Sequence, residues 1–440
     1  MNKVNVGEVI GNAKFNKYFF GIFILGFLAT FFDGYDMAVY GVTLPSLMPD
    51  LGLEPTQAGM LASATSCGFV FGAIVFGMLA DKFGRKRILI IGILLYSVFT
   101  GLCGIVQLVP LFAICRFLAG IGIASVIPLA SAMISEFSPK KNRNFLGTMT
   151  VFGNGFGTTM CTLIGLIVLA HFTWHTMYLI AFISLAVAAL IFFAYPESIA
   201  TLLKKKDNEK IGIALQKFEP SFKPSDTDEY EVSEFSQTKL PLRILFEGGR
   251  ARITILLWIA FFVTFYLALG INTWLPQMSG MMGYQLQGLA FTLVYFCGGL
   301  IGAPASGLLA NKFGLKRVLI IDYIVSAILI LILTIHMNEI LFVVILFIAG
   351  MFVNLPVLLM FSYVSQCYPV HVRGTALGWG SGLGRTGSIL SPILIGALLQ
   401  ADIPVTNVFA TFAIPMAVGA ICISLTKKDL TLHNVAEKKG

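Results

Sequence analysis

The stretch Gly77-Met-Leu-Ala-Asp-Lys-Phe-Gly-Arg-Lys-Arg87 occurs a second time, 230 residues later, as Gly307-Leu-Leu-Ala-Asn-Lys-Phe-Gly-Leu-Lys-Arg317. Eight of the eleven positions are identical, and each copy lies between two long apolar stretches. The same offset relates Arg143 to Arg373. A membrane chain built from two parallel repeats is the plan of one large transporter architecture. The sequence therefore predicts two repeated halves, and it directs attention to what the chain moves.

Composition predicts a chain that lies mostly within a lipid bilayer. Of 440 residues, 57% are apolar and 12% are charged, whereas a soluble domain carries about 25% charged residues. Apolar runs of about 20 residues, long enough to cross a hydrocarbon core roughly 30 Å thick, recur along the chain. We predict twelve spans, at approximately 18–46, 57–80, 87–107, 109–137, 144–170, 174–196, 252–276, 285–310, 317–336, 340–367, 374–400 and 404–426.

The predicted fold class is all-α and integral to the membrane, with twelve transmembrane helices in two six-helix bundles and a long cytoplasmic central loop. The first bundle is expected over residues 1–196, and the second, with a cytoplasmic tail, over 252–440. Residues 197–251 form the only long polar stretch and are interpreted as a linker. We expect this linker to act as a tether near anionic lipid, with a short surface helix over 210–218.

The positions of the basic residues predict the orientation. If both termini are cytoplasmic, every Lys and Arg except Arg116 and Arg385 falls on the cytoplasmic side, and the outer loops contain none. This pattern follows the positive-inside rule and supports the count of twelve spans. It indicates a multi-pass protein of the plasma membrane, the inner membrane of a bacterium. The cytoplasmic location of the basic residues also explains the net charge of +8, so we expect no nucleic acid as a partner.

The sequence does not favour an enzyme or a cofactor. All seven cysteines fall inside the predicted spans, and none has metal-site spacing. A thiol in a membrane helix usually behaves as a small apolar residue. No His-rich, Cys-rich or nucleophile motif is present. Nothing in the sequence demands more than a monomer.

Ionised groups inside the predicted spans are the candidates for function. A charge at the centre of a membrane helix costs at least about 2.5–3.5 kcal/mol, so each one requires a reason. The candidates are Asp33, Asp36, Arg116, Glu136, Asp322 and Arg385.

Asp33 and Asp36 are three residues apart in the first span and therefore share a helix face, with Tyr40 a further turn along. We expect Asp36 roughly 15 Å, and Arg116 roughly 10 Å, from the outer ends of their helices. At these similar depths the acids and the arginine can pair. Two nearby carboxylates cannot both ionise at low cost in a low dielectric, so we expect one of them to bind a coupling proton. The alternative is a structural ion pair that locks the first and fourth helices together.

Arg385 lies near the middle of the eleventh span, and no acid of the second half is expected at its depth. A guanidinium matches a carboxylate, so Arg385 and Arg116 are candidate receptors for the charge of a small organic anion. Phe32, Tyr35 and Tyr40 are candidates for stacking on an aromatic ring. The alternative for Arg385 is a bond to backbone carbonyls where glycines interrupt the helix.

Glycines cluster in the fifth and eleventh spans, which correspond across the repeat. Small residues let helices approach closely in a membrane. We expect the clusters, which include Gly153, Gly157 and Gly384, to mark sliding interfaces; simple close packing is the alternative.

Charged pairs at the inner side are expected to act as latches. Glu136 ends the fourth span near Arg143, and Asp81 lies in the loop after the second span beside Arg85. Such pairs can close one conformation and break in the other. The repeat replaces both acids by amides, so we expect an asymmetric latch carried by the first half.

These residues bring out a resemblance to the major facilitator superfamily along the whole chain. The pattern G-x-L-A-D-x-x-G-R-K over 77–86 resembles its signature between helices 2 and 3. The fourth-span residues 116–122, Pro128 and 136–139 are similar to its helix 4 pattern. The resemblance implies a conformational role for Gly77, Asp81, Gly84 and Arg85.

Within that superfamily, the chain resembles the aromatic acid/proton symporter family. The similarity is carried by Asp33-Gly-Tyr-Asp36 in the first span and by two segments, 368–374 and 378–387, that hold Arg373 and Arg385. It implies import of benzoate-like carboxylates with protons, and importance of the helix 1 acids, Arg116, Glu136 and the two later arginines. Arg373 lies at the inner membrane boundary, where gating and ligand contact are both open.

The leading hypothesis is proton-coupled uptake of a small organic anion, an aromatic carboxylate such as benzoate or hydroxybenzoate, by alternating access. The alternatives are a nicotinate-, shikimate- or muconate-like acid, or an exporter of similar compounds. From a different class, a membrane-embedded solute sensor stays open, although the polar linker and tail are short for a signalling domain.

Overall fold

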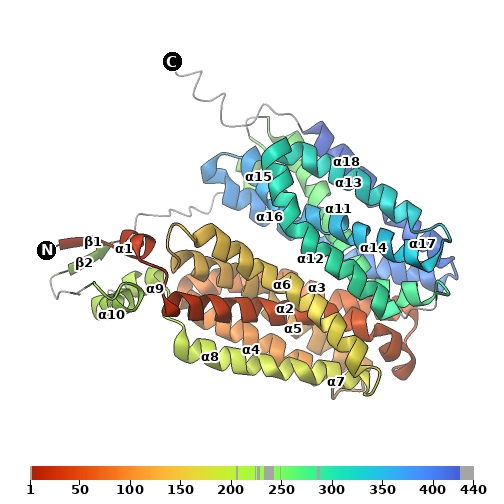
Figure 1. The fold of residues 1–440 in the computed structure, drawn as a ribbon, viewed down its shortest axis with the longest axis horizontal. Helices are drawn as coiled ribbons and strands as arrows, with labels where there is room; N and C mark the ends of the chain where they lie inside the picture. Colours follow the sequence, from red (N-terminus) through yellow and green to blue (C-terminus); the bar gives the residue numbers. More distant parts are fainter. Residues whose placement is uncertain are drawn as a thin grey trace. The chain divides into compact units, whose positions relative to one another are not determined.

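The computed structural model describes residues 2–204, 207–222, 224, 228–231, 242–247, 249–284 and 288–426 (Figure 1). Its contacts divide the chain into two compact units. The first comprises Met1–Val39, Cys67–Cys161 and Val168–Phe235, and the second comprises Tyr40–Ser66, Thr162–Ile167 and Ser236–Gly440. The bundle boundaries expected at 196 and 252 stay predictions.

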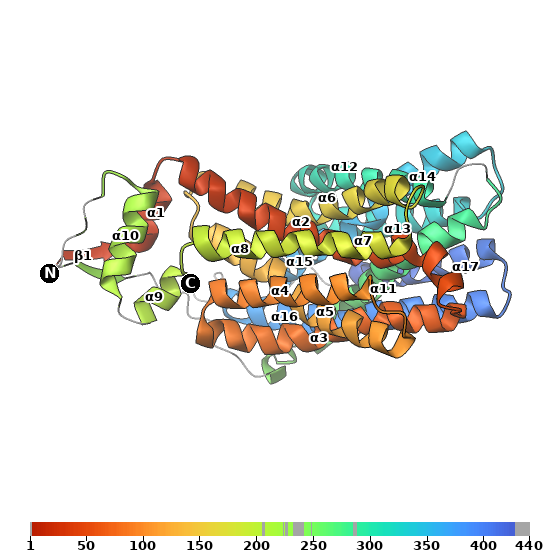
Figure 2. The ribbon, with the colours of Figure 1, turned by 90° about the horizontal axis from the view of Figure 1, so that it is seen from below.

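Long helices make up most of the first unit, and α2, α4, α5 and α8 run alongside one another in both views (Figures 1 and 2). Parts of three helices belong to the second unit, and they are residues 40–50 of α2, 55–66 of α3 and 162–167 of α6. The elements are β1 (Asn2–Asn5), α1 (Val6–Asn12), α2 (Lys17–Asp50), α3 (Pro55–Phe83), α4 (Arg85–Cys103), α5 (Val109–Glu136), α6 (Arg143–Val168), α7 (Trp174–Leu179), the 3₁₀ turn η1 (Ile180–Ile183), α8 (Ser184–Ala194), α9 (Ile199–Lys204), α10 (Asn208–Phe218) and β2 (Asp228–Glu231).

The second unit is also helical, and proline and asparagine interrupt one of its helices. At the break between α14 and α15, Pro356 lacks an N–H, and the side chain of Asn354 donates to the Gly350 carbonyl at 3.3 Å. The elements are η2 (Leu242–Leu245), α11 (Ala251–Gly280), α12 (Gly288–Phe313), α13 (Leu315–Ile332), α14 (Glu339–Val353), α15 (Leu355–Cys367), α16 (Val370–Gln400), α17 (Val405–Thr411) and α18 (Ala413–Leu425).

The twelve predicted spans each correspond to a helix or a broken helix. Eleven helices within the described residues are long and apolar enough to cross a membrane. The span expected at 317–336 is α13, which is shorter and carries Lys316, Arg317 and Asp322. The sixth, tenth and twelfth spans are each divided, as α7–α8, α14–α15 and α17–α18.

The repeated sequence stretch forms the same turn twice. Gly84 joins α3 to α4 with φ 101°, and Gly314 joins α12 to α13 with φ 86°. Residues with a Cβ rarely adopt this region, so glycine is needed at both positions. The turn therefore explains one of the identities between the two copies.

A small lobe made of β1, α1, α10 and β2 lies beyond one end of the first-unit helices (Figures 1 and 2). The strands pair in parallel, with Val4 opposite Tyr230. Asn16 connects this lobe to α2, because its side-chain oxygen accepts from Tyr18 and Phe19 N–H groups while its amide donates to the Phe218 carbonyl at 3.0 Å.

The ring of Phe218 anchors the same lobe. It stacks on Phe137, at the end of α5, with 5.1 Å between ring centroids, and lies at the same distance from Phe19 of α2. The short helix expected over 210–218 is confirmed as part of α10, but this region is a folded element attached to α2 and α5 and more than a tether.

Candidate functional site

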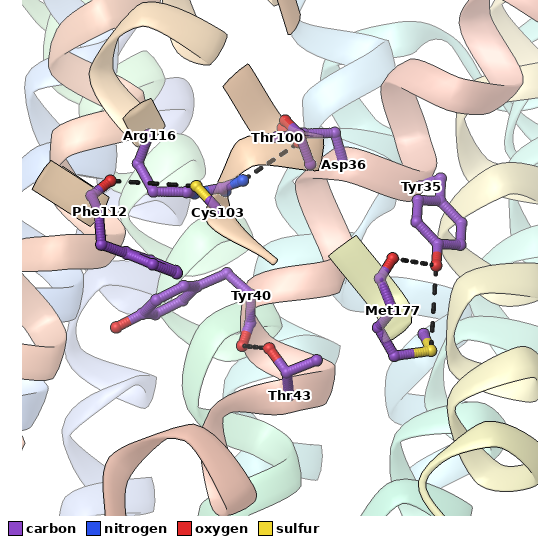
Figure 3. A network of polar contacts seen from close by, with 9 residues as sticks. All are labelled: Tyr35, Asp36, Tyr40, Thr43, Thr100, Cys103, Phe112, Arg116 and Met177. Atoms are coloured by element: carbon purple, nitrogen blue, oxygen red, sulfur yellow. Dashed lines mark hydrogen bonds and ion pairs between the residues drawn. The ribbon is translucent and has the colours of Figure 1, made fainter. Parts of the chain in front are cut away.

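Asp36 and Arg116 form a buried ion pair between α2 and α5. Arg116 Nη1 lies 3.1 Å from Asp36 Oδ1, and the two side chains are 3% and 1% exposed. The hydroxyl of Thr100, from α4, donates to the same carboxylate oxygen. Figure 3 shows the Arg116 and Thr100 side chains converging on Asp36. The similar depth expected for the acid and the arginine thus results in a direct contact.

Asp33, one turn earlier on α2, has a different partner. The side-chain amide of Asn154, on α6, donates to Asp33 Oδ2 at 2.6 Å, and Asp33 is fully buried. Neither Asn154 nor Thr100 was identified from the sequence. Asn154 is a neutral amide between Gly153 and Gly155 in an apolar span, and that contrast is the signal that would have identified it.

Glycines let α2 and α6 pack backbone against backbone around Asp33. A Cβ on Gly34 would lie 1.9 Å from the Asn154 carbonyl oxygen, and one on Gly157 would lie 1.9 Å from that of Phe31. The Thr158 hydroxyl also donates to the Gly34 carbonyl at 3.2 Å. These contacts fix the position of Asn154 along α6 relative to Asp33 on α2.

The glycine clusters therefore pack helices of one unit together. Gly153 and Gly157 face α2 in the first unit, and Gly384 faces Phe261 of α11 in the second. A side chain at each of these positions would meet backbone or ring atoms of a packed neighbour, which agrees with close packing. The expectation that these glycines mark sliding interfaces stays a prediction.

Two of the three candidate aromatic side chains have their hydroxyl groups bonded to the backbone. Tyr35 donates to the Met177 carbonyl at 2.8 Å, and Tyr40 donates to that of Ala58 at 2.6 Å. Both tyrosines are almost fully buried. Figure 3 shows the Tyr35 ring directed towards Met177. Phe32 is half-buried, with its ring edge-on to Phe31 at 5.2 Å.

Arg385 belongs to the second unit, on α16. Its guanidinium carbon lies 4.9 Å from the centre of the Phe265 ring, and the residue is partly exposed. A cation over an aromatic face is attracted by the ring quadrupole, which orients the guanidinium plane. Asp322, also in this unit, is buried on α13.

The inner latch residues are arranged around Glu136. Arg85 Nη1 lies 3.1 Å from Glu136 Oε2, and Ser198 donates to both carboxylate oxygens at 3.0 and 2.9 Å. Ser198 was not identified from the sequence. The side chain of Asp81 lies outside the described residues. At Gly77 a Cβ would meet nothing within 4 Å, so packing in this structure does not require glycine there.

Arg143 and Arg373 make the same contact in the two halves. Arg143 Nη2 donates to the Ser138 carbonyl at 3.4 Å, and Arg373 Nε donates to that of Tyr368 at 3.1 Å. Each arginine reaches five residues back, across the turn that precedes its helix. This geometry favours a role in holding the turn over contact with a ligand.

Breaking the Glu136 pair is expected to slow turnover more than it lowers stability. Partly exposed ion pairs contribute about 0–1 kcal/mol to stability, and Arg85 is 33% exposed. We expect Glu136→Gln to lower the transport rate several-fold while substrate affinity and the melting temperature stay near those of the wild type. Rate and affinity are measured by uptake and by ligand-dependent thermal shift.

Glu247→Gln is the matched control for this variant. It removes the ion pair of Glu247 with Arg243, whose side chains are 55% and 88% exposed. The control should transport normally. A large affinity change with normal turnover in Glu136→Gln would contradict a latch.

The sequence matches a known protein family and several transporters. The family model described as Major Facilitator Superfamily matches residues 26–294 and 282–440. The chain is 32% identical to the benzoate transport protein of Acinetobacter baylyi, over 96% of this chain and 92% of that protein. It is 30% identical to the 4-hydroxybenzoate transporter of the same species, over 99% and 96%, and 29% identical to the gentisate transporter of Corynebacterium glutamicum, over 94% and 89%.

Solved structures support the same fold. The D-xylose–proton symporter structure aligns with a TM-score of 0.75 at 18% identity, covering 94% of this chain and 98% of that one. The predicted fold class, twelve transmembrane helices in two six-helix bundles, is confirmed, and the resemblance seen in the sequence is confirmed with it. The relatives are named as transporters, which agrees with the prediction that the chain is not an enzyme. The chain belongs to the Major Facilitator Superfamily.

Proposed function

We propose that this protein is a proton-coupled secondary transporter that imports a small aromatic carboxylate, such as benzoate or a hydroxybenzoate, by alternating access. The observation that carries the proposal is the buried group of two acids and one arginine on α2 and α5. Ionisable groups buried in membrane helices typically mark ion and proton pathways. The names of the most similar relatives support an aromatic acid as the substrate.

The two arginines are suited to different tasks. Arg116 is buried and engaged by Asp36, which favours the locking role that was the alternative from sequence. Arg385 is partly exposed, and its planar guanidinium matches a carboxylate. We therefore assign the substrate carboxylate to Arg385, with Arg116 stabilising the acidic site.

The proposal also assigns roles to the aromatic side chains and to the inner latch. Among the three candidates Phe32 has the most accessible ring, so it is the first choice for stacking on the substrate. The Arg85–Glu136 pair would close the inner side in one conformation and open in the other.

The proposed orientation rests on the charge distribution. We place the protein in the inner membrane of a bacterium with both termini cytoplasmic. In this proposal it acts as a monomer, because nothing in the sequence demands more. The bundles cover residues 1–196 and 252–440, with the linker over 197–251 between them.

Uptake into proteoliposomes tests this function. The purified protein is reconstituted, and labelled benzoate is added with and without an inward proton gradient. We expect accumulation above equilibrium with the gradient, and loss of accumulation when a protonophore is added. A thermal-shift panel of aromatic and aliphatic acids identifies the preferred substrate, because a bound ligand stabilises the folded state by mass action.

Other acids, the reverse direction and a sensor are distinguished by the same assay. Relatives named as a niacin transporter and a cis,cis-muconate transport protein are 26% and 27% identical, so nicotinate and muconate belong in the panel. Binding without net accumulation would favour a sensor. Accumulation under an outward proton gradient would favour an exporter.

A further inference from the structure

Asp36 forms an ion pair through its contacts. Its Oδ1 accepts from Arg116 and from Thr100. A guanidinium has only donors, so it bonds well to an ionised acid and poorly to a protonated one. A proton on Asp36 would also leave the charge of Arg116 uncompensated at a site that is almost fully buried. The contacts therefore assign Asp36 to the ion pair with Arg116.

Asp33 has a partner that fits both of its protonation states. Asn154 donates to Asp33 Oδ2 through its side-chain amide. A primary amide carries two N–H donors and a carbonyl acceptor. The donors bond to a carboxylate, and the carbonyl oxygen can accept from the O–H of a carboxylic acid. Asn154 is therefore suited to an acid that alternates between the two forms.

The backbone contacts keep this amide at the acid. The Asn154 carbonyl lies against Gly34, the residue after Asp33, and Thr158 bonds to the Gly34 carbonyl. Since α2 and α6 meet backbone to backbone at this point, the Asn154 side chain starts from a position fixed relative to Asp33.

Ionisable side chains from α2 itself and from α4, α5, α6 and α7 lie around the two acids. Arg116 is the cation among them, and its Nη1 is engaged by Asp36. The other groups that the described residues bring near the acids are weak acids, and they include Tyr96 and Cys103 of α4, Tyr35 of α2, Cys161 of α6 and, next to Tyr35, Tyr178 of α7.

We propose that Asp33 is the group that binds the coupling proton and that Asn154 is its positioning residue, while Asp36 stays paired with Arg116. This inference rests on the proposed proton-coupled function and divides the two acids between two roles. One O–H bond forms on the Asp33 carboxyl when the proton enters and breaks when the proton leaves. Asn154 keeps its own protons throughout.

Infrared spectroscopy of the purified full-length protein tests the assignment without substrate. Asp322 is another acid buried in a membrane helix, so every variant carries Asp322→Asn as background. The C=O stretching band of protonated carboxylic acids is followed as pH is varied above the range in which exposed carboxylates titrate. We expect the band in this background, its loss on adding Asp33→Asn, and its retention on adding Asp36→Asn/Arg116→Gln, which leaves the net charge of the site unchanged. Persistence of the band with Asp33→Asn, its loss with Asp36→Asn/Arg116→Gln, or its absence from the background would overturn the proposal.

Asn154→Leu tests the positioning role, with Thr159→Val on the same helix as its control. Thr159 donates to its own helix at the Gly155 carbonyl, so its loss should leave the band unchanged. We expect Asn154→Leu to shift the pH midpoint of the band by about one unit or more, since hydrogen bonding sets the balance between the two forms. An unchanged midpoint would remove Asn154 from the proposal.

Two transport measurements separate this inference from the proposed function. Asp33→Asn should still exchange labelled for unlabelled benzoate across the membrane, because exchange needs no net proton movement. Its accumulation of benzoate under a proton gradient should fall about tenfold or more. Loss of both activities in Asp33→Asn, with the protein folded by size exclusion, would count against a proton-specific role. If the wild type moves no benzoate but the infrared pattern holds, the substrate assignment fails and the proton site stands.

Discussion

Arg116→Gln is expected to lose transport and to destabilise the first unit by about 3–5 kcal/mol, because removing one partner of a buried ion pair leaves the other charge uncompensated. Asp36 would keep the Thr100 hydroxyl as a donor but lose the positive charge. Uptake in proteoliposomes and thermal unfolding of the purified protein in detergent measure the two effects.

Two variants serve as controls for this prediction, one with both charges removed and one with a substitution at Arg385. Asp36→Asn/Arg116→Gln removes both charges, so it should recover much of the stability lost in the single variant, which is the coupling expected for residues in contact. Arg385→Gln should weaken anion binding with little destabilisation, because Arg385 is partly exposed. An Arg116→Gln protein as stable as the wild type would show that the pair does not hold α2 and α5 together.

Gly34→Ala is expected to prevent α2 and α6 from packing in their observed positions. The added Cβ would lie 1.9 Å from the oxygen and 2.7 Å from the carbon of the Asn154 carbonyl, and both are backbone atoms. Overpacking in a well-packed core costs typically about 1–3 kcal/mol, and a clash with backbone should reach or exceed the upper end. Size exclusion and thermal unfolding should show a less stable protein with little uptake.

Gly21→Ala on the same helix is the matched control. A Cβ there meets nothing within 4 Å, and the residue is exposed. Alanine is favoured over glycine in a helix by about 1 kcal/mol, so this variant should be at least as stable as the wild type. Equal behaviour of the two variants would show that the close approach at Gly34 is not required.

The helical architecture could be predicted because its causes are local in the sequence. Apolar runs of membrane-spanning length identified each of the spans, and the repeat put Gly84 and Gly314 at corresponding positions, although it did not predict their turns. The breaks within spans were not predicted. The break before Pro356 depends on one proline and on the side chain of Asn354, and both are easily overlooked within a strongly apolar run.

The charged residues of the candidate site could be predicted from the sequence. Asp36 and Arg116 stand out because ionised groups are costly in hydrocarbon, and helix geometry gives their depth. Asn154 and Thr100 were missed because neutral polar residues are common in membrane helices, and Ser198 was missed because it lies in the stretch interpreted as a linker. The importance of all three depends on which segments become neighbours. A repeat offset gives no information on those contacts, since each copy has its own neighbours.

The pairing of β1 with β2 has a consequence for the order of assembly during synthesis. The two strands are more than 220 residues apart in the chain, and β1 begins at Asn2. During synthesis β1 must wait for its partner until the helices from α2 to α10 have emerged from the ribosome. Long-range pairings of this kind form slowly. The β1–β2 pair is thus among the last parts of the first unit to form.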